Sequence, residues 1–188
     1  MLYVIIIFLF FLFIAVTLYF TRFKYKRKIK TEIKTYIKSA AFGPFVVWFC
    51  IILSLMLPFE TPISAYNLPR NDALVWVGEG MVVISILLLY WGHKTIGNQW
   101  PVVNDMTNYR MVTTGPYKYI RHPIYLSFFL FTIGKTLVFA NLLLLIIIPS
   151  LIMLYVHAMM EEQKLAKKFG NSYLDYMSRT GRFAPYLF

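Results

Sequence analysis

The chain has 188 residues, of which 59% are hydrophobic and 14% are charged. A typical soluble domain carries about 25% charged residues, and a soluble domain of this length cannot hide so much apolar surface. We therefore predict an all-α integral membrane protein whose solvent includes lipid. The formal net charge is +11, but the basic residues stand in short segments between apolar runs, which favours a membrane over nucleic acid as the partner.

Five apolar segments have the composition expected of membrane-crossing helices. They cover residues 1–20, 39–59, 73–92, 124–139 and 142–160. The first lacks the basic n-region and cleavage site of a signal peptide, so we expect a membrane helix there. The last two are separated by little more than Ala140 and Asn141, which predicts a tight helical hairpin. Pro149 predicts a kink in the fifth helix.

Lysine and arginine are concentrated in three of the connecting segments. Residues 21–38, 93–121 and the part after Met160 hold eight, four and five of them, against two on the opposite side. The positive-inside rule places the basic side in the cytoplasm and the N-terminus outside. We divide the chain into residues 1–92, three membrane helices with a basic cytoplasmic loop, and residues 93–188, a core that carries the chemistry.

The tail after the fifth segment has the pattern of an amphipathic helix over residues 161–178. Gly170 interrupts this pattern and can divide it into two helices. The apolar residues that share one face are Leu165, Phe169, Tyr173 and Tyr176.

The run TTGPYKYIRHPIY, residues 113–125, contains the first candidate site. Gly115-Pro116 predicts a turn, and Pro123 suits the first turn of a helix. The positive end of that helix, with Arg121 and His122 beside it, could bind an anionic group. Alternatively, these two residues mark the lipid interface with an aromatic belt of Tyr117, Tyr119 and Tyr125.

A second candidate site lies at the end of the fifth segment. His157 and Glu161 are four residues apart, so they share a helical face, and Glu162 follows. Acids at a membrane boundary need water, a partner or a cation, although an ordinary charged helix end gives the same pattern. Glu79, deep in the third segment, is either a protonated packing residue or a polar wall of a substrate cavity.

These motifs form an ordered set that resembles the isoprenylcysteine carboxyl methyltransferase family and its prokaryotic relatives. Phospholipid methyltransferases share its RHP-x-Y and EE parts. The resemblance covers residues 93–188. Its motifs are Thr114-Gly115-Pro116-Tyr117, Arg121-His122-Pro123-Ile124-Tyr125, Glu161-Glu162, Phe169-Gly170, Tyr173, Tyr176 and Thr180-Gly181-Arg182-Phe183 with Pro185.

The resemblance implies S-adenosylmethionine as the cofactor and a pocket on the cytoplasmic side. The residues implied to bind the cofactor are Tyr109, Arg110, Met111, Val112, Tyr117, His122, Pro123, Ile124, Tyr125 and Glu161. Catalytic roles are implied for His157 and for Arg182, which would help to close the site. Asn98, Trp100, His157 and Glu162 are assigned to the substrate side. No metal is expected.

Two positions depart from the family pattern. His157 stands where the family usually has an arginine that is assigned to the substrate, and Val102 replaces a polar cofactor contact. The acceptor is therefore either a prenylcysteine-type carboxylate or another nucleophile, such as a phospholipid amine or a small thiol, for which His157 would be the base. A sterol-reductase-like enzyme using NADPH and a membrane scaffold are further alternatives. The expected partners are a lipophilic substrate and membrane lipid; the sequence carries no signal for an oligomeric state.

Overall fold

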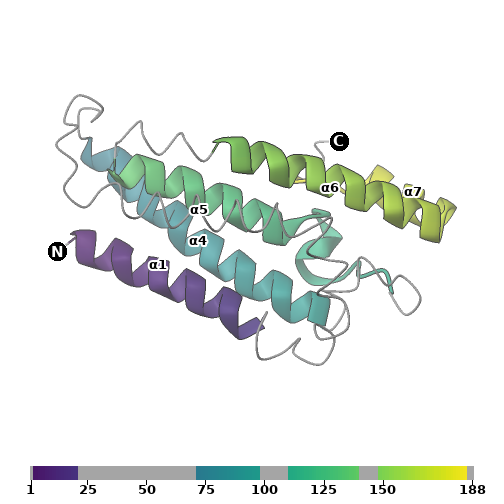
Figure 1. Cartoon of the computed structure of the whole chain (residues 1–188), viewed down its shortest axis with the longest axis horizontal. Coiled ribbons are helices and arrows are strands. Elements are labelled where there is room, and N and C mark those ends of the chain that lie inside the picture. The colour runs from purple at the N-terminus through teal and green to yellow at the C-terminus, as the bar shows by residue number, and fades with distance from the viewer. Residues whose placement is uncertain (1, 21–70, 98–109, 140–147, 186–188) are drawn as a thin grey trace.

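The computed structural model describes residues 2–20, 71–97, 110–139 and 148–185, which are the coloured parts of Figure 1. They form five α-helices and one short 3-10 helix, and no strand is found among them. The elements are α1 (Leu2–Leu18), α4 (Asp72–Ile96), η5 (Gly115–Lys118), α5 (Pro123–Phe139), α6 (Ile148–Phe169) and α7 (Asn171–Arg179). The predicted all-α class is confirmed.

Helices α4 and α5 run in opposite directions and make the most extensive packing between any two elements of the described residues (Figure 1). Two glycines allow this contact. A Cβ on Gly78 would lie 2.6 Å from the Gly134 carbonyl oxygen, and a Cβ on Gly134 would lie 2.6 Å from the Gly78 oxygen. Small residues at a crossing let two backbones approach closely, as in membrane helix pairs.

Helix α1 packs beside this pair through aromatic side chains. Phe13 is fully buried, and its ring stacks on that of Phe131 with the centroids 4.3 Å apart. Phe128 contacts the same ring edge-on at 5.3 Å. Such aromatic contacts add to the gain from burying apolar area, so α1 belongs to the same core as α4 and α5.

Helix α4 continues one turn beyond the predicted end of the third apolar segment. Its N-terminus is capped by the Asn71 side chain, which accepts a hydrogen bond from the Ala73 N–H at 2.9 Å. By length and composition α4 is the one helix among the described residues that could cross a membrane, and α5 is a shorter apolar helix. The predicted second span and the predicted hairpin turn lie outside the described residues.

The boundary between the fifth span and the tail differs from the prediction. Helix α6 runs without a break to Phe169, so the tail helix predicted from residue 161 is the continuation of the fifth apolar segment. Gly170 then ends it with φ 54°, a backbone conformation that favours glycine. The predicted division at Gly170 is confirmed. Pro149 is the second residue of α6, and because the residues before it are outside the described part, the kink stays a prediction.

Candidate functional site

The loop before α5 is built around the predicted Gly-Pro turn. Gly115 has φ 57°, and the Tyr117 N–H donates to the Thr114 carbonyl at 3.1 Å. A Cβ on Gly115 would lie 2.7 Å from the Thr95 hydroxyl oxygen. The turn therefore packs against the end of α4 and directs the buried Tyr117 side chain into the protein.

The C-terminal segment lies along the same loop and pairs with it. Ile120 and Gly181 form a parallel β-bridge. The backbone N–H of Arg121 donates to the Gly181 carbonyl at 2.8 Å, and that of His122 donates to the Arg182 carbonyl at 3.1 Å. These two N–H groups just before α5 consequently bind the protein's own tail and not an external anion.

Glu162 is the centre of the charged network at this junction. Its carboxylate accepts hydrogen bonds from Arg121 Nε at 2.9 Å and from His122 Nε2 at 3.2 Å. Arg182 donates from Nε at 3.1 Å and from Nη2 at 2.7 Å, one bond to each carboxylate oxygen. Such two-pronged arginine–carboxylate pairs combine strength with a fixed geometry. Arg121 also donates to the carbonyls of Met177 and Thr180.

The environment of Glu162 keeps its carboxyl ionised. Only 3% of the residue is exposed. Burial raises the pKa of Glu162, but the hydrogen bonds from His122, Arg182 and Arg121 outweigh burial and hold the pKa well below its usual range. A buried charge is tolerated when it is paired and hydrogen-bonded, which describes this residue.

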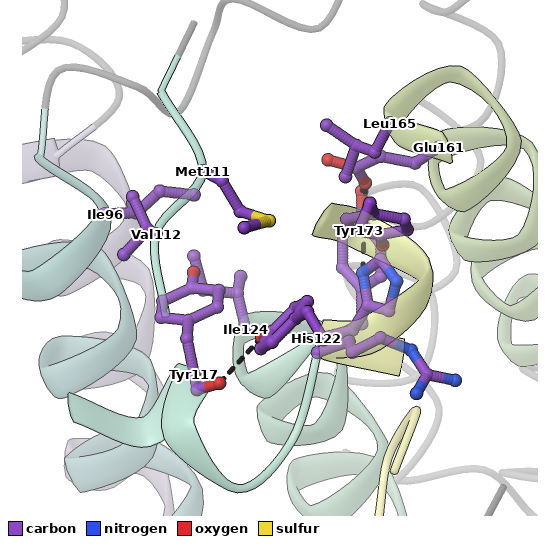
Figure 2. Close-up of a pocket in the computed structure, with 12 residues that line it drawn as sticks. Ile96, Met111, Val112, Tyr117, His122, Ile124, Glu161, Leu165 and Tyr173 are labelled. Atoms are coloured by element: carbon purple, nitrogen blue, oxygen red, sulfur yellow. Dashed lines mark hydrogen bonds and ion pairs between the residues drawn. The ribbon is translucent and has the colours of Figure 1, made fainter. Parts of the chain in front are cut away.

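Glu161 points in a different direction, toward a small cavity (Figure 2). Its Oε2 accepts a hydrogen bond from the Tyr125 hydroxyl at 3.0 Å and lies 3.9 Å from His122 Nδ1. The His122 and Tyr125 rings are nearly parallel, 3° apart, with centroids separated by 5.2 Å. His122 thus has one carboxylate on each side, of which Glu161 is the one that faces the cavity.

The cavity is closed by the loop, α4, α5, α6 and α7 together. Its floor and walls are mostly aromatic and aliphatic, and Met111 points into it (Figure 2). The lining residues are Ile96, Met111, Val112, Tyr117, Arg121, His122, Ile124, Tyr125, Glu161, Leu165, Tyr173 and Tyr176.

Helix α7 covers this cavity through the two tyrosines on its buried face. The Tyr176 hydroxyl donates to the Tyr117 carbonyl at 2.6 Å, and burial raises the pKa of Tyr176 to about 12. Tyr173 is 2% exposed and packs with Leu165 of α6. The tail therefore packs back over the cavity.

Seven of the residues expected to bind the cofactor line this one cavity. They are Met111, Val112, Tyr117, His122, Ile124, Tyr125 and Glu161. Pro123 is buried at the start of α5 without lining it, and Arg110 is exposed. Tyr109, Asn98, Trp100 and Val102 lie outside the described residues. Glu162 and Arg182, expected at the substrate side and at the closure of the site, bind each other beside the cavity instead of lining it.

Five lining residues were not among the residues expected to bind the cofactor or the substrate. One of them, Arg121, belongs to the first candidate site. Leu165, Tyr173 and Tyr176 belong to the predicted apolar face of the tail, and such a face must pack against something. Ile96 lies in the turn by which α4 extends beyond its predicted end.

A second, larger cavity lies between α5, α6 and the C-terminal segment. It has a volume of about 460 Å³, and its lining is almost entirely apolar: Leu126, Phe129, Ile148, Leu151, Ile152, Tyr155, Phe183 and Ala184. Arg182 stands beside it, donating to the Tyr155 hydroxyl at 2.9 Å. The ring of Phe183 lies 5.9 Å from that of His122, so the two cavities have neighbouring walls.

His157 is half-buried on α6, one turn before Glu161. Its ring contacts that of Tyr125 edge-on, with the centroids 6.2 Å apart. His157 and Glu161 therefore both contact Tyr125, as expected for two residues on the same face of α6. Glu79 is buried in α4, and its Oε1 has no hydrogen-bond partner among the described residues.

The described residues are helical, with paired glutamates, an arginine–histidine–proline helix start and a tail that closes over one cavity. These are the features that the resemblance to the methyltransferase families implies. The profile of the phospholipid methyltransferase family matches residues 73–172, more than half of the chain, and the chain belongs to this family. The matched region holds both the loop before α5 and the glutamate pair.

Two curated relatives agree with this assignment. The chain is 26% identical over 148 residues to protein-S-isoprenylcysteine O-methyltransferase of Saccharomyces cerevisiae, covering 76% of this chain and 61% of the relative. It is 26% identical over 156 residues to methanethiol S-methyltransferase of a Pseudomonas strain, covering 75% of this chain and 58% of that relative. The chain thus spans about three fifths of their lengths. The resemblance to the isoprenylcysteine methyltransferase family is confirmed.

Proposed function

We propose that this protein is an S-adenosylmethionine-dependent methyltransferase embedded in a membrane, with a lipophilic methyl acceptor. The observation that carries the proposal is the cavity in front of Glu161. A carboxylate that accepts one tyrosine hydrogen bond faces a pocket whose other walls are mostly aromatic and aliphatic, with Arg121 and His122 beside it. This combination suits a ligand with a positive charge at one end and a flat base at the other.

The chain's own groups fit such a cofactor, which supplies an electrophilic methyl group on a sulfonium. Glu161 would bind the cationic part of the cofactor, and the Tyr125 hydroxyl would hold the Glu161 carboxylate in place. Tyr117, Val112 and Leu165 offer the surfaces against which a base packs. In this structure the cavity is about 40 Å³, whereas ligand pockets usually measure about 300–1,000 Å³. Binding therefore requires one wall to move, and Met111, which belongs to no helix and points inward, is the wall residue best placed to do so.

The acceptor is proposed to be a prenylcysteine-type carboxylate whose apolar part occupies the second cavity. A carboxylate is already ionised at neutral pH and needs no general base. One carboxylate oxygen forms the new bond to the methyl carbon while the carbon–sulfur bond breaks and its electron pair stays on the sulfur. No proton is transferred. The protein's contribution is alignment of the two reactants, worth about 7–11 kcal/mol in favourable cases.

A second candidate acceptor, a small thiol or an amine, is favoured by the way the basic side chains are already occupied. Among the described residues, Arg121, His122 and Arg182 all bind Glu162, and a carboxylate acceptor would compete with it for them. A thiol acceptor would not compete with Glu162 for these side chains. It must instead lose its proton, and His157, on the Glu161 side of α6, is the residue we assign as the base.

The membrane placement is part of the proposal. The five apolar segments cross the bilayer, with the pocket on the cytoplasmic side together with residues 21–38. Large apolar side chains of α4, such as Trp76 and Leu87, are exposed in the isolated chain and support a lipid-facing surface. Cysteine-accessibility labelling tests the placement; labelling of residues 30 and 66 from the same side would contradict it.

Binding of S-adenosylhomocysteine to the purified protein tests the cofactor assignment. Calorimetry is expected to show binding by the wild type and much weaker binding by the His122→Ala and Glu161→Ala variants. Asp175→Asn, an exposed change on the outer face of α7, is the matched control and is expected to bind like the wild type. Binding of NADPH without any binding of S-adenosylhomocysteine would assign the protein to the reductase class instead.

A further inference from the structure

The two adjacent glutamates of α6 have different surroundings. Glu161 lines the cavity and has one tyrosine donor, whereas Glu162 is turned away and accepts bonds from two arginines and one histidine. A residue whose oxygens are already occupied in this way is poorly suited to contact a substrate. The position of its three partners in the chain indicates a structural role for Glu162.

We propose that Glu162 is a positioning residue that fastens the C-terminal segment and His122 in the arrangement the cofactor pocket requires. Glu161, by contrast, is the glutamate that contacts the ligand. This inference rests on the proposed function, because the pocket that Glu162 shapes is the proposed cofactor site.

The partners of Glu162 come from separate parts of the chain. Arg121 and His122 precede α5, Arg182 follows α7, and Glu162 itself lies on α6. The backbone bonds from Arg121 and His122 to the C-terminal segment join the same pieces. Without the carboxylate, the guanidinium groups of Arg121 and Arg182 would face one another beside His122 with no counter-charge in a buried place. Like charges repel strongly there, so the segment around Arg182 is expected to detach.

The effect reaches the ligand through a short chain of contacts. Glu162 holds His122 Nε2, the His122 ring stacks on Tyr125, and the Tyr125 hydroxyl holds Glu161. Loss of Glu162 frees the imidazole to rotate, which removes the support of Tyr125 and then that of Glu161. Glu162 therefore influences the ligand without touching it.

Limited trypsin digestion of the full chain in detergent micelles tests the fastening without any ligand. In the wild type the bond after Arg182 is expected to resist cleavage, because its guanidinium is held by Glu162 and Tyr155. Glu162→Gln is expected to speed this cleavage at least tenfold. Glu161→Gln, the neighbouring change of the same kind, is the control and is expected to leave the rate unchanged. Equal cleavage rates in wild type and Glu162→Gln would overturn the proposal.

A double-mutant cycle on S-adenosylhomocysteine affinity tests the link to the pocket. Glu162→Gln and Arg182→Gln are each expected to weaken binding, and the double variant no more than the worse single one, because both break the same contact. Multiplying losses in the Glu162–Arg182 pair would refute the inference.

The two proposals can fail separately. Arg182→Gln leaves Glu162 with Arg121 and His122 as partners and serves as the milder variant if Glu162→Gln does not fold. Detachment of the C-terminal segment in that variant is then followed by cleavage after Arg179. A wild type that binds no S-adenosylhomocysteine would overturn the proposed function, while the digestion result would still decide whether Glu162 fastens the tail.

Discussion

Replacing Tyr125 by phenylalanine isolates one contact of the proposed cofactor site. The change removes the hydroxyl that donates to Glu161 Oε2 at 3.0 Å. It keeps the ring, which stacks on His122 with centroids 5.2 Å apart. Any effect on ligand binding therefore reports how well the Glu161 carboxylate is held, not a loss of packing.

The expected magnitude follows from the exposure of the bond. Tyr125 is half-buried, so water competes for its partner and the ordinary net value of about 0.5–1.5 kcal/mol for a protein hydrogen bond applies. Since 1.4 kcal/mol corresponds to a factor of ten, the Kd for S-adenosylhomocysteine is expected to rise roughly 2- to 13-fold.

Calorimetry on the purified variant measures this change directly. Tyr119→Phe is the matched control, because Tyr119 lies on the same loop with an exposed side chain and its hydroxyl has no part in the site. It is expected to bind like the wild type. Unchanged affinity in Tyr125→Phe, or an equal loss in both variants, would refute the reasoning that Tyr125 orients Glu161.

Three further predictions concern packing, acid stability and the acceptor. Gly78→Ala places a Cβ 2.6 Å from the Gly134 oxygen and is expected to destabilise the protein by about 1–3 kcal/mol in denaturant unfolding, whereas Gly80→Ala, with open space around it, is expected to be neutral or stabilising. Because the folded pKa of Glu162 lies below its ordinary value of 4.5, its contribution to stability is present above that pH and lost as the pH falls further; the wild-type Tm should therefore drop more steeply below about pH 4.5 than that of Glu162→Gln. His157→Arg is expected to retain turnover of a carboxylate acceptor and to abolish turnover of a thiol, since arginine cannot accept a proton; unchanged rates for both Arg and Ala variants would show that His157 only packs.

The helices and much of the pocket could be predicted because local patterns determine them. Apolar length located α1, α4 and α5, and the conformational freedom of Gly170 located the break before α7. The apolar face of the tail contained the residues that cover the cavity. Each of these inferences needs only a few neighbouring residues and a known period.

The family resemblance implied that Glu161 binds the cofactor, but the position of Glu162 outside the cavity could not be predicted from the sequence. Adjacent helix residues point about 100° apart, so one of the pair had to turn from the cavity, but which one depends on where Arg182 and Arg121 lie. Those arginines are 20 and 41 residues away from Glu162. Their position follows from the β-bridge between Ile120 and Gly181, which no local pattern signals.

Because α6 is one continuous helix from Ile148 to Phe169, a tilt at its first residue displaces Glu161 near its other end. At about 1.5 Å per residue, roughly 20 Å separates its first residue from Glu161. A tilt of about 5° at the far end would move the carboxylate by about 2 Å, and displacements of 1 Å can cost about a hundredfold in rate. Helices tilt to match the thickness of the surrounding hydrocarbon. With α6 in a bilayer, the length of the lipid tails thus becomes a variable that sets how well the site is aligned.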